Sequence, residues 1–163
     1  MKTIPLYRLI SFIGLAISFQ LTLHASYLLL PMDLKQSNHL KAYGITYWVI
    51  AQNVDAYWLL NYRGGSFALP NVKLIEKECL TRGVSFEIIT DAEFGRIQNE
   101  IANPEINQDV IKLEKAPKIA VYTPELNEKG ERIQPWDDAV TMALTYAEIP
   151  FEKIYDKEII GGL

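Results

Sequence analysis

The chain has 163 residues, 49% of them hydrophobic, which is enough for one ordinary core and too short for two full domains of typical size. Two of the sixteen basic residues, Lys2 and Arg8, precede Ser26, so the remainder carries fourteen basic and twenty acidic residues, a net charge of −6. This balance argues against nucleic-acid binding, and the single cysteine, Cys79, excludes an intrachain disulfide and a thiolate metal cluster.

Residues 1–25 have the order of a secretory signal peptide. The two early basic residues are followed by an uncharged apolar stretch and by a small residue, Ala25, after which we predict cleavage. The alternative is an uncleaved membrane anchor over residues 9–32, favoured by the bulky Leu23 close to the predicted cleavage point. We therefore expect an exported protein, periplasmic or secreted, that meets a membrane only through this leader.

Beyond the leader, short apolar runs alternate with stripes at helical spacing. A strand is predicted at 27–32, and Asp33 with Gln36 is expected to cap the helix that follows. The second strand is predicted at 56–60, followed by a glycine loop and a helix that ends at Gly83. This order is typical of β-α-β units.

The pattern continues towards the carboxyl end. A third strand is predicted at 84–89, with Thr90 and Glu93 as a capping box for the next helix. The polar stretch from Asn103 to Pro117 is interpreted as a linker or subdomain boundary.

The last part of the chain repeats the alternation. Two more strands are predicted at 118–122 and 151–155, and the helix between them begins at Asp137-Asp138, with a buried stripe of Val140, Ala143, Leu144 and Ala147.

Strands joined by helices of this length are expected to be parallel and covered on both faces. The sequence thus predicts an α/β fold with a doubly wound, mainly parallel sheet, flavodoxin-like or Rossmann-like, behind a signal-peptide helix. A first unit of three strands and three helices is expected at 26–112, and a second, incomplete unit at 113–163. With its last strand uncovered, the chain is interpreted as truncated.

The candidate binding residues are Asn61, Arg63, Gly64, Gly65 and Ser66, which directly follow the second predicted strand. In a doubly wound sheet this position lies on the rim where ligands bind. The glycines would let backbone amides approach an anion, and Arg63 offers a fork for a carboxylate or phosphate, so a small anionic or sugar-like ligand is expected. The alternative is a tight turn with glycines at positive φ and a solvated arginine.

Other reactive residues favour structural roles. Cys79 lies mid-helix on a buried face, and His39 has no metal-ligand partner at suitable spacing. The adjacent Asp137 and Asp138 are interpreted as helix caps. The aromatic residues Tyr43, Tyr47, Trp48, Tyr57 and Trp58 could stack a sugar or base, although their spacing favours core packing. No catalytic residue, metal site or cofactor is expected.

Five segments carry a family resemblance: LPMD at 30–33, HLKAYG at 39–44, LLNYRGGSF at 59–67, KAPKIAVY at 115–122 and PWDDAV at 135–140. Together they resemble exported bacterial proteins commonly labelled asparagine synthetase B. The resemblance implies a later class I glutamine amidotransferase-like domain with a Cys nucleophile, a His and a Glu, none of which can be assigned in this chain. The chain also departs from genuine asparagine synthetase B, because position 2 is Lys and a Ser-Gly-Gly-x-Asp motif is missing.

Two functions follow as hypotheses. The first is an amidotransferase-like exported protein whose catalytic part is absent from this chain. The alternative is a periplasmic ligand-binding or structural module without catalysis.

Overall fold

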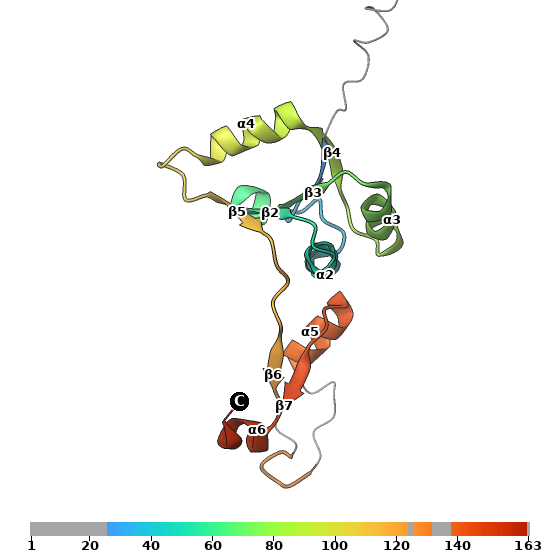
Figure 1. The fold of residues 1–163 in the computed structure, drawn as a ribbon, viewed down its shortest axis with the longest axis vertical. Coiled ribbons are helices and arrows are strands. Elements are labelled where there is room, and N and C mark those ends of the chain that lie inside the picture. Colours follow the sequence, from blue (N-terminus) through green and yellow to red (C-terminus); the bar gives the residue numbers. More distant parts are fainter. Residues whose placement is uncertain (1–25, 124–125, 132–137, 163) are drawn as a thin grey trace, which may run out of the picture.

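The computed structural model describes residues 26–123, 126–131 and 138–162 (Figure 1). These residues form a five-stranded sheet with helices on both faces, and a smaller unit around a two-stranded sheet. The elements are β1 Ser26–Leu30, α2 His39–Ala51, β2 Ala56–Leu60, η1 Tyr62–Gly64, β3 Phe67–Pro70, α3 Lys73–Thr81, β4 Glu87–Thr90, α4 Asp91–Ile101, β5 Asp109–Leu113, β6 Ala120–Tyr122, α5 Ala139–Ala147, β7 Glu152–Ile154 and α6 Asp156–Gly161.

The larger sheet has the strand order β4-β1-β3-β2-β5, and all four neighbouring pairs are antiparallel. The prediction of a doubly wound, mainly parallel, flavodoxin-like sheet is therefore wrong. The crossover through α2 does join two strands that run in the same direction, β1 and β2, but β3 lies antiparallel between them. Likewise β3 and β4 run in the same direction with β1 between them.

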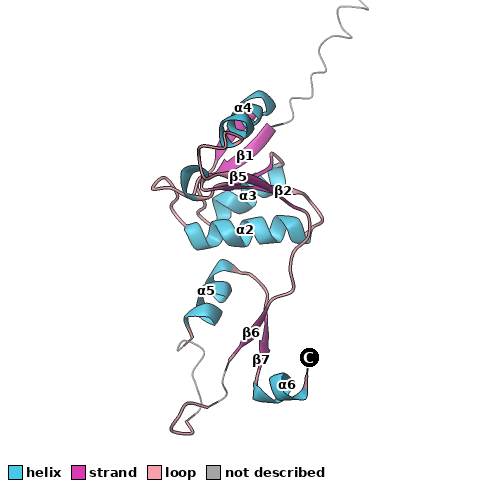
Figure 2. Cartoon of the chain, turned by 90° about the vertical axis from the view of Figure 1, so that its left-hand side faces the viewer, coloured by secondary structure: helices cyan, strands magenta, loops and turns pink. Residues whose placement is uncertain are grey.

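The apolar run of β1 explains why a parallel sheet was predicted. Leu28 and Leu30 pack into the core under α2 and α3, whereas Leu29 packs with Phe94 of α4 on the opposite face. Figure 2 shows the sheet between α4 on one side and α2 with α3 on the other. A continuous apolar strand reports that both faces are covered, and it carries no information about strand direction.

Two strands were missed in the sequence. β3 lies in the segment that was interpreted as a glycine loop before a helix, and it becomes a central strand of the sheet. β5 lies within the predicted linker 103–117 and pairs along its whole length with β2. The first unit thus has five strands in place of the three expected. β5 lies at the edge of the sheet and carries two charged residues, Asp109 and Lys112.

Two predictions about helix ends are confirmed. Thr90 and Glu93 form the predicted capping box of α4, and Gly83 adopts a positive φ of 67° after α3. Helix α2 begins later than expected, because Asn38 caps it by accepting a hydrogen bond from the Lys41 amide.

The smaller unit is a β-α-β element followed by α6. β6 and β7 pair in parallel, with α5 as the crossover helix that packs against α2. The predicted stripe of α5 is wrong at Val140, which is 54% exposed, while Ala147 is buried. Within the described ranges, no helix has the length and apolar character needed to cross a membrane. The predicted signal peptide, its cleavage after Ala25 and Asp137 lie outside the described residues.

Candidate functional site

The segment Asn61–Ser66 forms a tight turn between β2 and β3. Asn61, Arg63, Gly64 and Gly65 all have positive φ, with values of 60°, 46°, 84° and 92°. Gly64 has a second constraint, because a Cβ atom there would lie 2.4 Å from the carbonyl oxygen of Met32. The turn therefore needs glycine at Gly64 both for backbone conformation and for close approach to the chain that leaves β1.

The guanidinium of Arg63 is held by two carboxylates of the same chain. Its Nε donates to Asp33 Oδ2 at 2.8 Å, and its Nη1 and Nη2 donate to the two oxygens of Glu87 at 2.8 and 3.1 Å. Hydrogen bonds from Arg63 hold the pKa of Asp33 and that of Glu87 below their ordinary values, and the Glu87 pair raises the pKa of Arg63. Three of the five N–H donors of Arg63 are thus directed at carboxylates of the same chain, and the side chain is 22% exposed.

The other residues of the turn also make internal contacts. The side chain of Asn61 donates to the carbonyl of Asn107 at 2.7 Å, and Ser66 is fully buried, with Oγ 3.3 Å from the carbonyl oxygen of Arg63. Gly65 is buried and its carbonyl accepts a hydrogen bond from Trp58 Nε1 at 3.2 Å. These contacts fix the turn to neighbouring segments of the chain. Ligand binding by these five residues stays a prediction.

The remaining sequence candidates take structural places. Cys79 is fully buried in α3, and burial raises the pKa of its thiol to about 12, so the nucleophilic thiolate is scarce near neutral pH. His39 Nε2 lies 3.2 Å from the carbonyl oxygen of Met32. Asp138 caps α5 by accepting a hydrogen bond from the Val140 amide at 2.9 Å, as its position predicted.

The predicted aromatic cluster is divided between the two faces of the sheet. Tyr57 packs with Tyr27 and Phe94 beneath α4. Trp48 lies against the guanidinium of Arg82, 5.9 Å from the ring centre. The other three aromatic residues of the cluster line an open apolar pocket on the opposite side.

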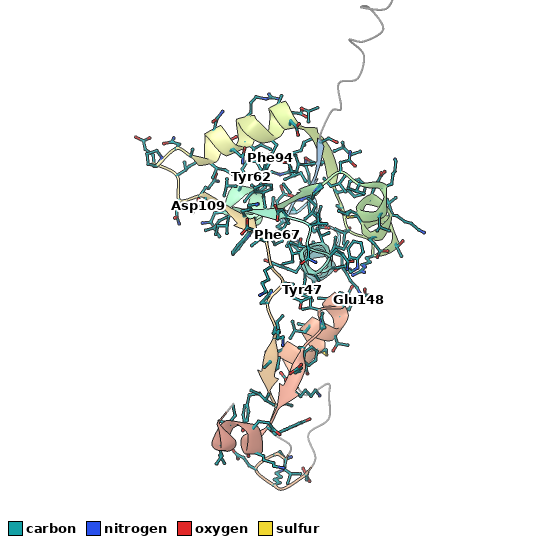
Figure 3. All side chains as sticks on the ribbon, in the orientation of Figure 1. Tyr47, Tyr62, Phe67, Phe94, Asp109 and Glu148 are labelled. Carbon is teal, nitrogen blue, oxygen red and sulfur yellow. The ribbon has the colours of Figure 1, made fainter. Side chains whose placement is uncertain are left out.

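This aromatic pocket has a volume of about 270 Å³ and no charged residue in its lining. It lies where α2 and the sheet meet the segment that follows α5. Its lining consists of Tyr43, Thr46, Tyr47, Ile50, Trp58, Phe67, Leu113, Pro117 and Ile149. Figure 3 labels Tyr47 and Phe67 on the pocket side of the sheet, whereas Phe94 and Tyr62 lie on the α4 side.

Each wall of the aromatic pocket is fixed by an identifiable contact. Tyr43 and Tyr47 are one helical turn apart on α2, so they project from the same face. Tyr43 packs edge-to-face on Phe67 with ring centres 5.3 Å apart, and the hydroxyl of Tyr47 donates to the Pro117 carbonyl at 2.9 Å. Trp58 stacks with Phe67 at 6.3 Å. The rings are therefore held before any ligand arrives.

Ile149 comes from the smaller unit, and the junction beside it brings that unit onto α2. Glu148 adopts a positive φ of 60° at the end of α5. One of its carboxylate oxygens lies 2.6 Å from Lys41 Nζ, and the other lies 2.9 Å from Arg82 Nη1. Figure 3 shows Glu148 at this junction, where α5 meets the larger unit.

The helices α2 and α5 meet closely at Gly44. A Cβ atom on Gly44 would lie only 1.7 Å from the carbonyl oxygen of Ala147, so the contact requires glycine. Beside it, Asn38 Nδ2 donates to the hydroxyl of Tyr146 at 2.8 Å, and Lys41 Nζ lies 5.0 Å from the centre of the Tyr146 ring. A backbone-to-backbone approach with polar contacts around it sets the position of α5.

Sequence reasoning found Tyr43, Tyr47 and Trp58 but assigned them to the core. It missed Phe67 and Ile149, because the first lies in an unrecognised strand and the second is near the pocket only in three dimensions. The helical spacing of the two tyrosines was the one available signal.

No group of three or more His, Cys, Asp or Glu residues suited to a metal ion occurs in the part of the chain that the structure describes. Comparison with protein-family models, with curated proteins and with solved structures gives no match to this chain.

Proposed function

We propose that this chain is a binding module whose aromatic pocket takes a small, flat, uncharged aromatic ring. The supporting observation is the pocket lining, which combines four aromatic side chains with no charged residue. A charged ligand would lose its hydration there without gaining a counter-charge, which costs several kcal/mol or more. Aromatic walls instead favour a ring that can pack edge-to-face or offset against them.

The size of the pocket limits the occupant. Its volume of about 270 Å³ falls just below the range of roughly 300–1,000 Å³ typical of small-molecule sites. A single or fused ring, free or carried on a larger molecule, suits this space better than a peptide helix or a nucleotide. The expected ligand therefore differs from the anionic one suggested by Arg63.

Indole is a suitable first probe because it is flat and uncharged. Amide and methyl NMR signals of Thr46, Ile50 and Ile149 should shift on titration with indole, and glucose at the same concentration should leave them unchanged. Tyr43→Ala removes one wall and should weaken indole binding about tenfold, equivalent to ~1.4 kcal/mol. Leu40→Ala is the matched control, since Leu40 lies on the same helix with 42% exposure, against 43% for Tyr43, and outside the pocket lining. Equal affinities of the two variants would contradict the proposal.

A second proposal rests on the resemblance to exported proteins labelled asparagine synthetase B. The observation that favours it is the parallel pairing of β6 and β7 around α5, the β-α-β unit from which the sheets of α/β enzymes are built. Cys79 is buried and the pKa of its thiol is raised, so we do not propose it as the glutaminase nucleophile. In this proposal the present chain supplies no catalytic group.

This proposal requires a longer gene product that continues beyond position 163, and its test is glutamine hydrolysis by that product. Ammonia release should depend on a cysteine encoded beyond position 163, and the chain of 163 residues alone should release none. Hydrolysis by this chain alone, or none by the complete product, would contradict the amidotransferase proposal.

Export to the periplasm or beyond is likewise a proposal, supported by the sequence of residues 1–25 alone. Amino-terminal sequencing of the mature protein should begin at Ser26. A start at Met1 in a membrane fraction would favour the uncleaved anchor over residues 9–32.

A further inference from the structure

We infer that Glu148 is a positioning residue, here called the latch, whose ion pairs hold Ile149 in the wall of the aromatic pocket. Through these ion pairs, ligand binding is coupled to the docking of α5 on α2. This inference rests on the proposed function. It adds a way in which occupancy of the pocket and the arrangement of the two units control each other.

The first step is chain connectivity. Ile149 directly follows Glu148, and the amide of Ile149 donates to the carbonyl of Leu144 at 3.0 Å, so the backbone between them is fixed. A rigid dipeptide transmits the position of the Glu148 carboxylate to Ile149. Among the pocket-lining residues, Ile149 is contributed by the segment between α5 and β7.

The second step is charge. The two oxygens of Glu148 each meet a different cation, Lys41 on α2 and Arg82 at the end of α3. The side chains of the two cations are only 16% and 14% exposed, so solvent satisfies their charges only in part. Arg82 has a second carboxylate partner, Glu78, whose Oε2 lies 3.0 Å from Arg82 Nη2. Glu148 is 50% exposed, which limits the strength of each pair but leaves its carboxylate accessible to salt.

Other contacts surround this junction. Gly44 lies against the Ala147 carbonyl, Asn38 donates a hydrogen bond to the Tyr146 hydroxyl, and Lys41 Nζ lies over the Tyr146 ring. The ion pairs of Glu148 add to these contacts and favour the docked arrangement, in which Ile149 lines the aromatic pocket.

A ligand that contacts both α2 and Ile149 binds the docked arrangement better than the undocked one. By linkage, whatever stabilises docking raises ligand affinity, and the ligand in turn stabilises docking by the same factor. Removing the Glu148 charge should thus weaken the ligand without touching the aromatic walls.

Glu148→Gln in the full chain is the test, with indole as the probe. Glu152→Gln on β7 is the matched control, because Glu152 is exposed and lies in the same unit outside the aromatic pocket. E148Q should weaken indole binding roughly two- to fivefold, as expected for partly exposed pairs, and E152Q should not. Salt near 1 M should weaken wild-type binding similarly and leave E148Q almost unchanged.

A second measurement separates the latch from the ligand. Without indole, hydrogen exchange at the amides of Leu144 to Ile149 should be faster in E148Q than in wild type and in E152Q. Unchanged exchange would overturn the latch, and faster exchange with unaltered indole affinity would overturn the coupling. Failure of wild type to bind indole at all would overturn the proposed function, and the coupling with it.

Discussion

Gly44→Ala tests whether backbone contact between α2 and α5 decides the arrangement of the two units. In an isolated helix, replacing glycine by alanine stabilises the helix by about 1 kcal/mol. Here the new Cβ atom would lie 1.7 Å from the Ala147 carbonyl oxygen, whereas Cβ contacts under 3.0 Å essentially never occur. Since both groups belong to backbone or are fixed to it, the end of α5 has to withdraw by more than 1 Å.

The expected cost is that of overpacking, about 1–3 kcal/mol, and it falls on docking alone. The sheet unit should keep its stability or gain up to ~1 kcal/mol from helix propensity. Hydrogen exchange should therefore become roughly five- to hundredfold faster in α5 and β7, while amides of β1 and β3 keep their protection.

Gly95→Ala is the matched control, because Gly95 also lies inside a helix, α4, and a Cβ atom there meets nothing within 4 Å. This variant should stabilise the protein by up to ~1 kcal/mol in a denaturant titration and leave exchange in α5 unchanged. If Gly44→Ala behaves like Gly95→Ala, the contact between α2 and α5 does not require glycine at position 44.

Three further results are expected. Cys79 should resist a thiol reagent in the native protein near pH 8 and react once the chain is unfolded, because burial raises its pKa to about 12; rapid native labelling would contradict this. Arg63 lowers the pKa of Glu87, so this pair contributes stability above the ordinary carboxyl pKa of 4.5 and loses it as the pH falls through the lowered value. Arg63→Met should accordingly show a smaller drop in denaturation midpoint between about pH 7 and 3.5 than wild type, and an equal drop would exclude the pair as the cause. Thr90→Ala should cost about 1 kcal/mol and speed exchange in the first turn of α4, where an unchanged midpoint would show that the capping box is dispensable.

The candidate site could be predicted only in part. Tyr43 and Tyr47 were named as members of an aromatic cluster that could stack a ring, but their helical spacing favoured core packing, and the sequence could not distinguish the two. Ile149 and Phe67 become pocket residues only when α5 docks and β3 enters the sheet. Arg63 shows the opposite case, since its residue type favoured a ligand and the fold supplied Asp33 and Glu87 instead.

The sequence by itself determined local structure: where β1 and β2 run, how Thr90 caps α4, and that Gly83 ends a helix. These features depend on neighbours in the chain, through hydrogen bonds and dihedral preferences that each segment carries with it. Strand order and direction were decided only by the tertiary structure. A strand buried on both faces has the same composition in either direction, so the antiparallel insertion of β3 between β1 and β2 leaves no mark in the apolar pattern.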